Sequence, residues 1–250
     1  MQTLGVDIGG SGIKGAIVET TTGELVEKRI RIDTPVPATD KAVVTTVKEL
    51  AKQFKWTGPV GCGYPGVVKN NTIYTAANLD KSLIGKNLGK AIKVASKCGN
   101  ICVLNDADAA GLAEMRFGAG RGVGGLVIMI TVGTGIGTSL FYNGALLPNT
   151  EIGHIQFKGK DAEKLLSEPA RLARHISRDR WAKQFKKYLE YLESLFWPDL
   201  FVLGGGGFKK PERFDGAFAG MRTSVQFAKF KNQAGIIGAA IAASEGVVVK

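Results

Sequence analysis

Hydrophobic and polar residues alternate along the first thirty-two positions in the manner of β-strands. The alternation predicts strands over residues 3–7, 13–18 and 25–32, with a glycine-rich turn after the first strand and a Thr-Thr-Gly turn after the second. Together the three strands predict an opening meander. Two prolines, Pro35 and Pro37, then interrupt the pattern.

Strand and helix patterns alternate through the rest of the first half. Asp40 is placed to cap a helix whose apolar positions, from Val43 to Phe54, fit the helical period. The alternation is typical of an α/β sheet. It predicts a strand over 60–63, long loops over 64–85, a helix over 88–97, a strand over 101–104 and a helix over 108–117.

The second half opens like the first, with a strand, a glycine turn and a returning strand over residues 126–142. A helix over 181–196 carries its large side chains on one face and stops at Pro198. The pattern then predicts a buried strand over 200–203, four glycines over 204–207, and a closing helix of small residues over 234–243.

A glycine-rich seam over residues 118–125 separates the two halves and is the candidate hinge. We therefore expect a first lobe over 1–117, joined by the C-terminal helix at about 234–250, and a second lobe over 118–233. The longest apolar run, 126–132, is much shorter than the ~20 residues that a membrane span needs, and no leader pattern precedes Leu4. A cytoplasmic protein without membrane attachment is expected.

Composition adds two anomalies to this picture. The chain has 34 glycines in 250 residues, about twice ordinary usage, and a formal net charge of +11. Clustered glycine indicates close approach of backbone to a ligand, and the charge suggests a polyanionic partner, whether nucleic acid, membrane or a phosphate compound. Three cysteines are too few for a disulfide framework or a four-cysteine zinc site.

Three glycine turns follow apolar strands, and each is a candidate phosphate site because glycine lets backbone N–H groups approach an anion. A single such turn also suits an ordinary hairpin, but three of them favour two lobes that face each other across a phosphate-bearing ligand. Phe208 departs from the small or polar residue expected after the third turn. The turns comprise Asp7, Gly9, Gly10, Ser11, Gly12 and Lys14; then Gly133, Thr134 and Gly135; then Gly205 and Gly206.

Two further groups of polar residues suit work on a hydroxyl-bearing substrate. Asp106 follows a predicted strand, where it suits a general base or a helix cap, and Asp108 fits the capping role better. Glu151 and His154 lie three residues apart, a spacing that suits sugar hydroxyls and also a metal pair. Neither a cysteine nor a third acid lies close by in the sequence, and this weakens the metal alternative.

These motifs, in this order, resemble those of the ROK family of sugar kinases within the actin-like ATPase superfamily. The resemblance implies an α/β fold of two RNase-H-like lobes. The stretches 34–39, 76–82, 147–151 and 198–201 resemble the branch of polyphosphate glucokinases, which phosphorylate glucose from inorganic polyphosphate and often also from ATP. ROK members typically carry a cysteine-rich zinc motif after the Gly-x-His, and no cysteine follows His154 here, so no zinc site is expected.

The resemblance also implies roles for individual residues. Asp106 would be the general base on the 6-hydroxyl of glucose, and Asp7 would lie near a Mg²⁺ among the phosphate-binding glycine turns. A homodimer is implied as well. The sugar ligands would be Asn78, Asn105, Asp106, Glu151, His154 and Glu168.

The positive charge is concentrated in three segments, over 81–97, 158–187 and 209–231, and the rest of the chain is net negative. Such a distribution suits a long polyphosphate, although basic helices are also common as solvated faces. Two alternatives stay open. One is a strictly ATP-dependent hexokinase for glucose, mannose or fructose, and the other is a non-catalytic, nucleic-acid-binding or regulatory ROK-like protein. Nucleic acid is the weaker alternative because the aromatic residues of 181–188 follow a core-type helical face.

Overall fold

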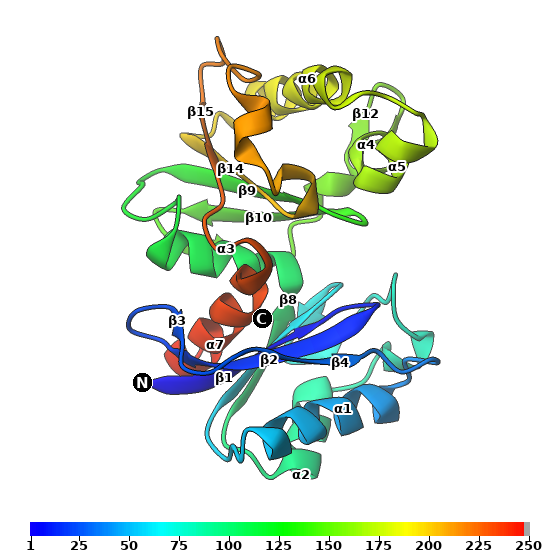
Figure 1. The fold of residues 1–250 in the computed structure, drawn as a ribbon, viewed down its shortest axis with the longest axis vertical. Coiled ribbons are helices and arrows are strands. Elements are labelled where there is room, and N and C mark those ends of the chain that lie inside the picture. Colours follow the sequence, from blue (N-terminus) through cyan, green and yellow to red (C-terminus); the bar gives the residue numbers. More distant parts are fainter. Residues whose placement is uncertain (248–250) are drawn as a thin grey trace. The chain divides into compact units, whose positions relative to one another are not determined.

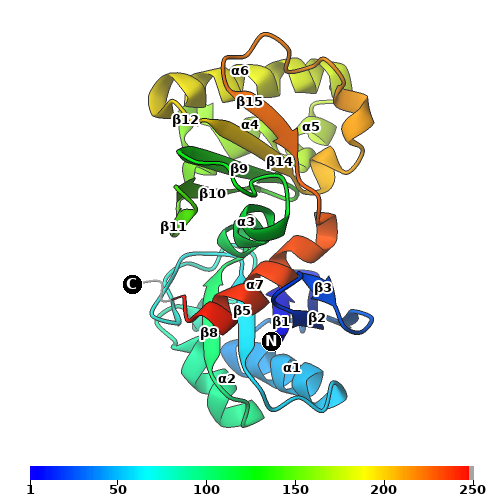
Figure 2. The same cartoon turned by 90° about the vertical axis from the view of Figure 1, so that its left-hand side faces the viewer.

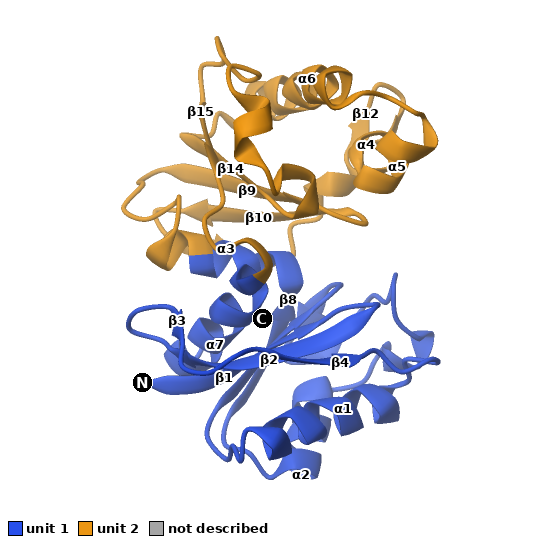
Figure 3. Cartoon of the chain, in the orientation of Figure 1, with its two compact units in different colours: residues 1–113, 233–250 blue, residues 114–232 orange. Residues whose placement is uncertain are grey.

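The structure, a computed structural model, describes residues 1–247 of the 250 in the sequence. The chain divides into two compact units: unit 1 is Met1–Ala113 with the chain from Gln233 onward, and unit 2 is the segment between them (Figure 3). The division falls a few residues before the predicted boundary at 117. The predicted closing helix over 234–250 is α7, Ala234–Glu245, and residues 248–250 of that range lie outside the described residues.

Unit 1 is built on a mixed sheet in the order β3-β2-β1-β5-β8, with β4 also paired to β2 (Figure 1). The β1 and β2 strands form an antiparallel hairpin, and β5 and β8 continue the sheet parallel to β1. The strands are β1 (Gln2–Ile8), β2 (Gly12–Glu19), β3 (Glu24–Leu25), β4 (Ile30–Asp33), β5 (Val60–Tyr64) and β8 (Ile101–Asn105); the short β6 (Val68–Lys69) and β7 (Thr72–Ile73) lie in the predicted loop region.

The prediction of a single strand over residues 25–32 is wrong. Two short strands, β3 and β4, pair with opposite ends of β2, so that Leu25 lies opposite Val18 and Asp33 lies opposite Gly12. The residues between them, 27–29, are charged and exposed, and this leaves them outside the ladder. The interruption matters for the site because it returns β4 to the first glycine turn.

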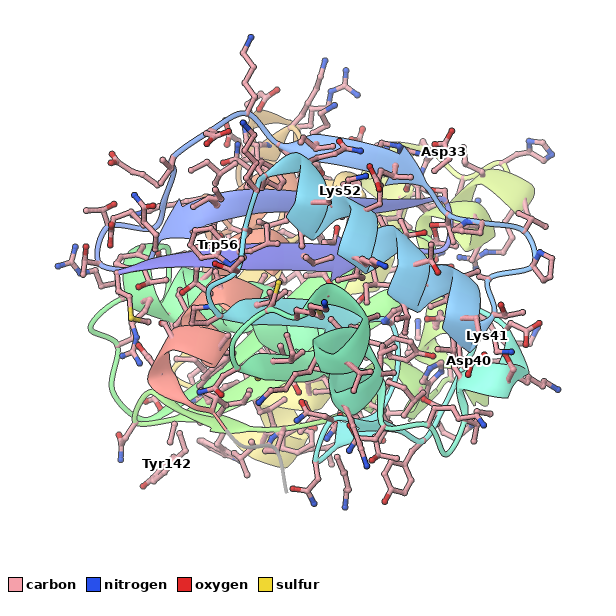
Figure 4. All side chains as sticks on the ribbon, turned by 90° about the horizontal axis from the view of Figure 1, so that it is seen from below. Asp33, Asp40, Lys41, Lys52, Trp56 and Tyr142 are labelled. Carbon is pink, nitrogen blue, oxygen red and sulfur yellow. The ribbon has the colours of Figure 1, made fainter. Side chains whose placement is uncertain are left out.

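Helices cover both faces of the unit 1 sheet: α7 packs on one face, and α1 (Asp40–Gln53) and α2 (Leu88–Ser96) pack on the other (Figures 1 and 2). The cap of α1 is Thr39, whose hydroxyl accepts a hydrogen bond from the N–H of Ala42, so the predicted cap at Asp40 is wrong by one residue. Asp40 instead lies in the first turn, where its charge suits the helix dipole, and Figure 4 shows it beside Lys41 at that end.

The α7 helix lies on the sheet almost without intervening side chains. A Cβ atom added to Gly61 would lie 1.8 Å from the carbonyl oxygen of Ala239, and one added to Gly5 would lie 2.0 Å from that of Ile236. On the helix itself, a Cβ on Gly238 would lie 1.6 Å from the carbonyl oxygen of Ala109 in α3 (Asp106–Phe117). Part of the glycine surplus therefore serves backbone packing rather than ligand binding.

Unit 2 repeats this arrangement. Its sheet has the order β11-β10-β9-β14-β15, with an antiparallel β9–β10 hairpin followed by parallel strands. The repeat agrees with the similar openings of the two halves of the sequence. Its elements are β9 (Leu126–Val132), β10 (Ile136–Tyr142), β11 (Ala145–Leu147), β12 (Gln156–Phe157), β13 (Lys160–Asp161), α4 (Ala162–Leu166), α5 (Glu168–Ala173), α6 (Arg178–Phe196), β14 (Leu200–Gly204) and β15 (Ser224–Phe227).

The core of unit 2 is rich in aromatic residues and includes Phe208. Its ring centroid lies 5.2 Å from that of Trp181 and 4.9 Å from that of Phe214, and its side chain is 3% exposed. A large residue after the third glycine turn thus has a structural reason. The predicted core face of α6 is confirmed at Trp181, whereas Leu195, which we also expected there, is half exposed one residue before the helix ends.

Candidate active site

The first glycine turn joins β1 to β2 in unit 1. The N–H of Gly9 donates to the carbonyl of Gly12 at 3.2 Å, which closes the turn. Behind it, the Lys14 ammonium lies 3.2 Å from an Asp7 carboxylate oxygen, as the cross-strand register of β1 and β2 requires. The predicted phosphate loop therefore has one carboxylate, Asp7, and one ammonium, Lys14, paired at the point where the two strands enter and leave it.

A second cation, which the sequence did not single out, supports this turn. The Arg31 guanidinium donates to the carbonyl of Ser11 at 2.7 Å, and a Cβ on Gly12 would lie 2.6 Å from its Cζ. Gly12 leaves the space that the guanidinium occupies. The alternation of Ile30-Arg31-Ile32 could have indicated that Arg31 shares a face with its partner Lys14, but not that it reaches the turn.

Asp106 lies where β8 gives way to α3. The side-chain oxygen of Asn105 accepts hydrogen bonds from the N–H groups of Ala107 at 2.8 Å and Asp108 at 3.1 Å, so Asn105 caps the helix. The expectation that Asp108 caps it is wrong, because the helix begins at Asp106 and Asp108 lies inside its first turn. The carboxylate of Asp106 is therefore on a helix start whose cap is supplied by another residue.

The loop after β5 brings further predicted residues to this end of the unit 1 sheet. Asn105 donates its amide to the carbonyl of Gly66 at 3.2 Å, and a Cβ on Gly10 would lie 3.2 Å from the carbonyl oxygen of Asn78. Asp7 is paired in register with Gly63, where a Cβ would lie 3.5 Å from the Cα of Asp106. The first glycine turn, Asn78, Asn105 and Asp106 thus gather within unit 1.

In unit 2, Glu151 immediately precedes a short 3₁₀ turn over Ile152–His154, and His154 is its last residue. A Cβ on Gly153 would lie 2.2 Å from the carbonyl oxygen of Ile136, so only glycine lets the turn pack on β10. The hydroxyl of Tyr188 in α6 donates to the carbonyl of Ile152 at 3.0 Å and holds the turn from the core side. The Glu-x-Gly-His spacing therefore has a structural basis.

Two acids that the sequence analysis did not name lie with this pair. An Asp161 carboxylate oxygen is 3.0 Å from Nδ1 of His154, and the carboxylate of Glu163 accepts from the N–H of Ile136 at 2.8 Å, against Gly135 of the second glycine turn. The hydrogen bond to Asp161 is the largest cause that raises the pKa of His154. Burial raises the pKa of Glu151, with Glu163 adding to it and His154 opposing it.

Glu168, the last of the predicted sugar ligands, pairs with two arginines. Its carboxylate accepts from Arg171 Nε at 3.0 Å and from Arg178 Nη2 at 2.8 Å. Burial opposes ionisation, but the two arginines outweigh it and lower the pKa of Glu168. Arg178 also donates to the carbonyl of Gly207 at 3.3 Å. Glu163, and not Glu168, contributes to the pKa shifts of both Glu151 and His154.

The second and third glycine turns meet at the carboxyl ends of adjacent parallel strands. Gly204 of β14 is in register with Thr131 of β9, and a Cβ on Gly205 would lie 2.4 Å from the carbonyl oxygen of Val132. Gly205 has φ of +81°, which a side chain would strain. Gly133, Thr134, Gly135, Gly205 and Gly206 are therefore brought together within unit 2.

Residues 3–171 match the family model described as ROK family. The chain belongs to the ROK family. It is 46% identical over 239 residues to the polyphosphate glucokinase of Mycobacterium tuberculosis (strain CDC 1551 / Oshkosh), covering 96% of this chain and 90% of that one.

Two solved structures are similar to this ROK chain over nearly all of its length. The inorganic polyphosphate/ATP-glucomannokinase of Arthrobacter sp. strain KM has a TM-score of 0.88 at 38% identity and covers 98% of this chain and 99% of its own. A ROK glucokinase of Streptomyces griseus, solved with glucose and AMPPNP, has a TM-score of 0.82 at 25% identity, with 98% and 100% covered. The ROK chain therefore has the two-lobed, actin-like kinase fold.

The ROK chain has a carboxylate suited to a divalent metal. Asp7 is partly exposed at the phosphate-loop end of β1, and Mg²⁺ in phosphoryl-transfer sites is held by one or two carboxylates together with phosphates and water. No group of three or more metal-ligating side chains occurs among the described residues. Asp7 therefore fits a metal that arrives with the phosphate donor.

None of the helices over residues 1–247 is long and apolar enough to span a membrane.

Proposed function

We propose that this chain is a glucokinase that transfers a phosphoryl group from inorganic polyphosphate, and also from ATP, to the 6-hydroxyl of glucose. The 46% identity to a polyphosphate glucokinase over 96% of the chain carries the proposal. The Arthrobacter structure supports it, since that protein's name includes both donors. A homodimer in the cytoplasm is part of the same proposal.

Asp106 is the general base in this proposal. A carboxylate that accepts the proton of a substrate hydroxyl makes the oxygen a better nucleophile, an effect typically worth ~10²–10⁴ in rate. Asn105 supplies the cap of α3, so that the Asp106 side chain is not required for capping. Asn78 and Asn105 bind sugar hydroxyls from unit 1.

In unit 2, Glu151 and His154 bind sugar hydroxyls together with Glu163. We assign Glu163 the role that the sequence analysis gave to Glu168, because Glu163 contributes to the electrostatic environment of both Glu151 and His154. Glu168 is assigned instead to holding Arg178 beside the third glycine turn, at Gly207. Glu168 carries one negative charge and its two arginine partners carry two positive charges, so the group has one net positive charge beside the third glycine turn for the donor.

The glycine turns of both units bind the phosphates of the donor, with Lys14 and Arg31 supporting the first turn. When bound, Mg²⁺ neutralises charge on the phosphoryl oxygens, and Asp7 is the residue that would hold it. In the second turn the N–H of Ile136 is already bonded to Glu163 and that of Gly133 to the carbonyl of Gly135, so the N–H groups of Thr134 and Gly135 are the ones proposed for a phosphate.

The basic segments extend the donor site for a long chain. All five lysines between residues 81 and 97 are exposed, as are most basic residues over 158–187. ATP offers only three phosphates, whereas polyphosphate offers one at every unit and can use cations beyond the pocket. This difference separates the proposal from a strictly ATP-dependent hexokinase.

Activity with polyphosphate is expected to fall more steeply with added salt than activity with ATP. Each phosphate neutralised by a lysine or arginine releases a counterion, so three extra contacts cost roughly twentyfold in affinity between about 50 and 200 mM salt. The measurement is kcat/KM for each donor across that range at saturating glucose. Equal slopes for the two donors would count against a cationic track.

Initial rates with each donor and acceptor test the proposed reaction. Glucose 6-phosphate, mannose 6-phosphate and fructose phosphate formation are followed with polyphosphate and with ATP in Mg²⁺. We expect glucose to be phosphorylated from both donors. Activity with ATP alone would favour the hexokinase alternative, and no activity with any pair would favour a regulatory ROK-like protein.

A further inference from the structure

Both carboxylate oxygens of Asp161 take part in hydrogen bonds. One oxygen, Oδ1, accepts from the N–H of Glu163 at 2.9 Å and caps α4, and the other, Oδ2, lies 3.0 Å from Nδ1 of His154. A carboxylate held from two sides has little freedom to rotate. Whatever it contacts is therefore held in one orientation as well.

The backbone that carries Asp161 is equally constrained. The β12–β13 hairpin pairs Asp161 with Gln156 across a two-residue turn of Lys158 and Gly159, whose φ angles are +52° and +72°. Phe157 of the same hairpin packs edge-on against the buried Tyr188, with ring centroids 5.6 Å apart. The aromatic core of unit 2 thus sets the position of the Asp161 carboxylate.

The opposite edge of the imidazole points to the predicted sugar ligands. Nε2 of His154 lies 3.9 Å from a carboxylate oxygen of Glu151. A carboxylate accepts only, so Nδ1 must donate to Asp161, and in the neutral ring Nε2 is then the acceptor. The His154 side chain is half exposed, which leaves room for a hydroxyl group to approach the ring.

We propose that Asp161 is a positioning residue that fixes the ring orientation and tautomer of His154, so that Nε2 meets a hydroxyl of the sugar. The inference rests on the proposed sugar-binding role of His154. Asp161 itself need not touch the sugar. Because its other oxygen caps α4 at Glu163, the same carboxylate sets the relative positions of His154 and Glu163.

The variant Asp161→Ser separates the two functions of this side chain. Serine is a good helix cap, so α4 and the backbone at Glu163 are retained, but its hydroxyl is too short to reach the imidazole. We expect KM for glucose to rise about tenfold, the size expected for loss of a hydrogen bond to a charged group, with kcat and KM for polyphosphate changed less than about threefold. Asp179→Ser, on the exposed start of α6, is the matched control and leaves KM for glucose unchanged.

Nitrogen NMR of the imidazoles tests the same inference without turnover. The chain has two histidines, and His154→Gln identifies which signals belong to His154. In the unaltered protein we expect neutral His154 to carry its proton on Nδ1, and in Asp161→Ser we expect that preference to be lost. A proton on Nε2 in the unaltered protein would overturn the inference, even if the serine variant failed to fold.

The sugar-binding role of His154 and the positioning role of Asp161 are contradicted by different results. If His154→Gln leaves KM for glucose unchanged, the sugar-binding role of His154 is wrong, and the inference falls with it whatever the NMR result. If His154→Gln raises KM for glucose but Asp161→Ser does not, His154 binds sugar without help from Asp161. That second result overturns the positioning role alone and leaves the proposed function intact.

Discussion

Asp106→Asn lowers kcat at least about a hundredfold while glucose still binds. Asparagine keeps the size and the hydrogen-bonding capacity of the side chain but has no basicity, so the 6-hydroxyl keeps its proton until the phosphoryl group has moved. The cap of α3 is Asn105, and the helix start does not depend on the substituted group. The measurements are kcat with polyphosphate and with ATP, and glucose affinity by calorimetry.

Asp40→Asn is the matched control for this substitution. Asp40 is also the first residue of a helix, α1, and is also capped by the preceding residue, Thr39. The Asp40→Asn variant loses the same charge at the same helical position, on a helix that carries none of the proposed site residues. We expect its kcat to stay within about twofold of the unaltered protein. An Asp106→Asn enzyme with comparable activity would remove Asp106 from the role of base.

Gly238→Ala lowers the free energy of unfolding by about 3 kcal/mol or more. The new methyl group would lie 1.6 Å from the carbonyl oxygen of Ala109, an atom of the α3 backbone that cannot turn aside as a side chain can. Relief requires a shift of α7 relative to α3, and such a shift also disturbs its close backbone contacts with the strands at Gly5 and Gly61. Denaturant unfolding followed by circular dichroism measures the loss.

Gly235→Ala is the control on the same helix. Its added Cβ would lie 3.6 Å from the nearest atom, on Asp7, which is ordinary contact distance. Alanine is a better helix former than glycine, so the variant gains up to about 1 kcal/mol. Equal losses in the two variants would show that the backbone approach of Gly238 is not what limits the packing.

The fold could be predicted largely because its periodic segments are strong. The β1–β2 hairpin, the β9–β10 hairpin and α6 follow from alternation or helical period. The split of residues 25–32 into β3 and β4 could not be predicted, since it depends on which part of β2 each half reaches. The four-residue β15 was missed because it is short and its pairing with β14 is distant in sequence.

The site could be predicted where its residues are contiguous in sequence. The first glycine turn and the Asn105-Asp106 pair lie together in the fold of unit 1, and Glu151 lies near His154 in unit 2. Contacts that cross between elements could not be predicted. The proposal of Glu163 as a sugar ligand depends on the contact between α4 and the second glycine turn, and the guanidinium of Arg31 reaches Ser11 through the β2–β4 ladder.

Direct transfer from polyphosphate to glucose is the central claim, and one assay tests it without ambiguity. The purified protein is incubated with glucose, Mg²⁺ and polyphosphate in buffer treated with apyrase, which removes ATP and ADP, and glucose 6-phosphate is measured over time. Direct transfer predicts that glucose 6-phosphate forms at the same initial rate as in untreated buffer, and that polyphosphate is consumed at the same time. No glucose 6-phosphate without nucleotide, together with normal turnover from added ATP, would contradict it.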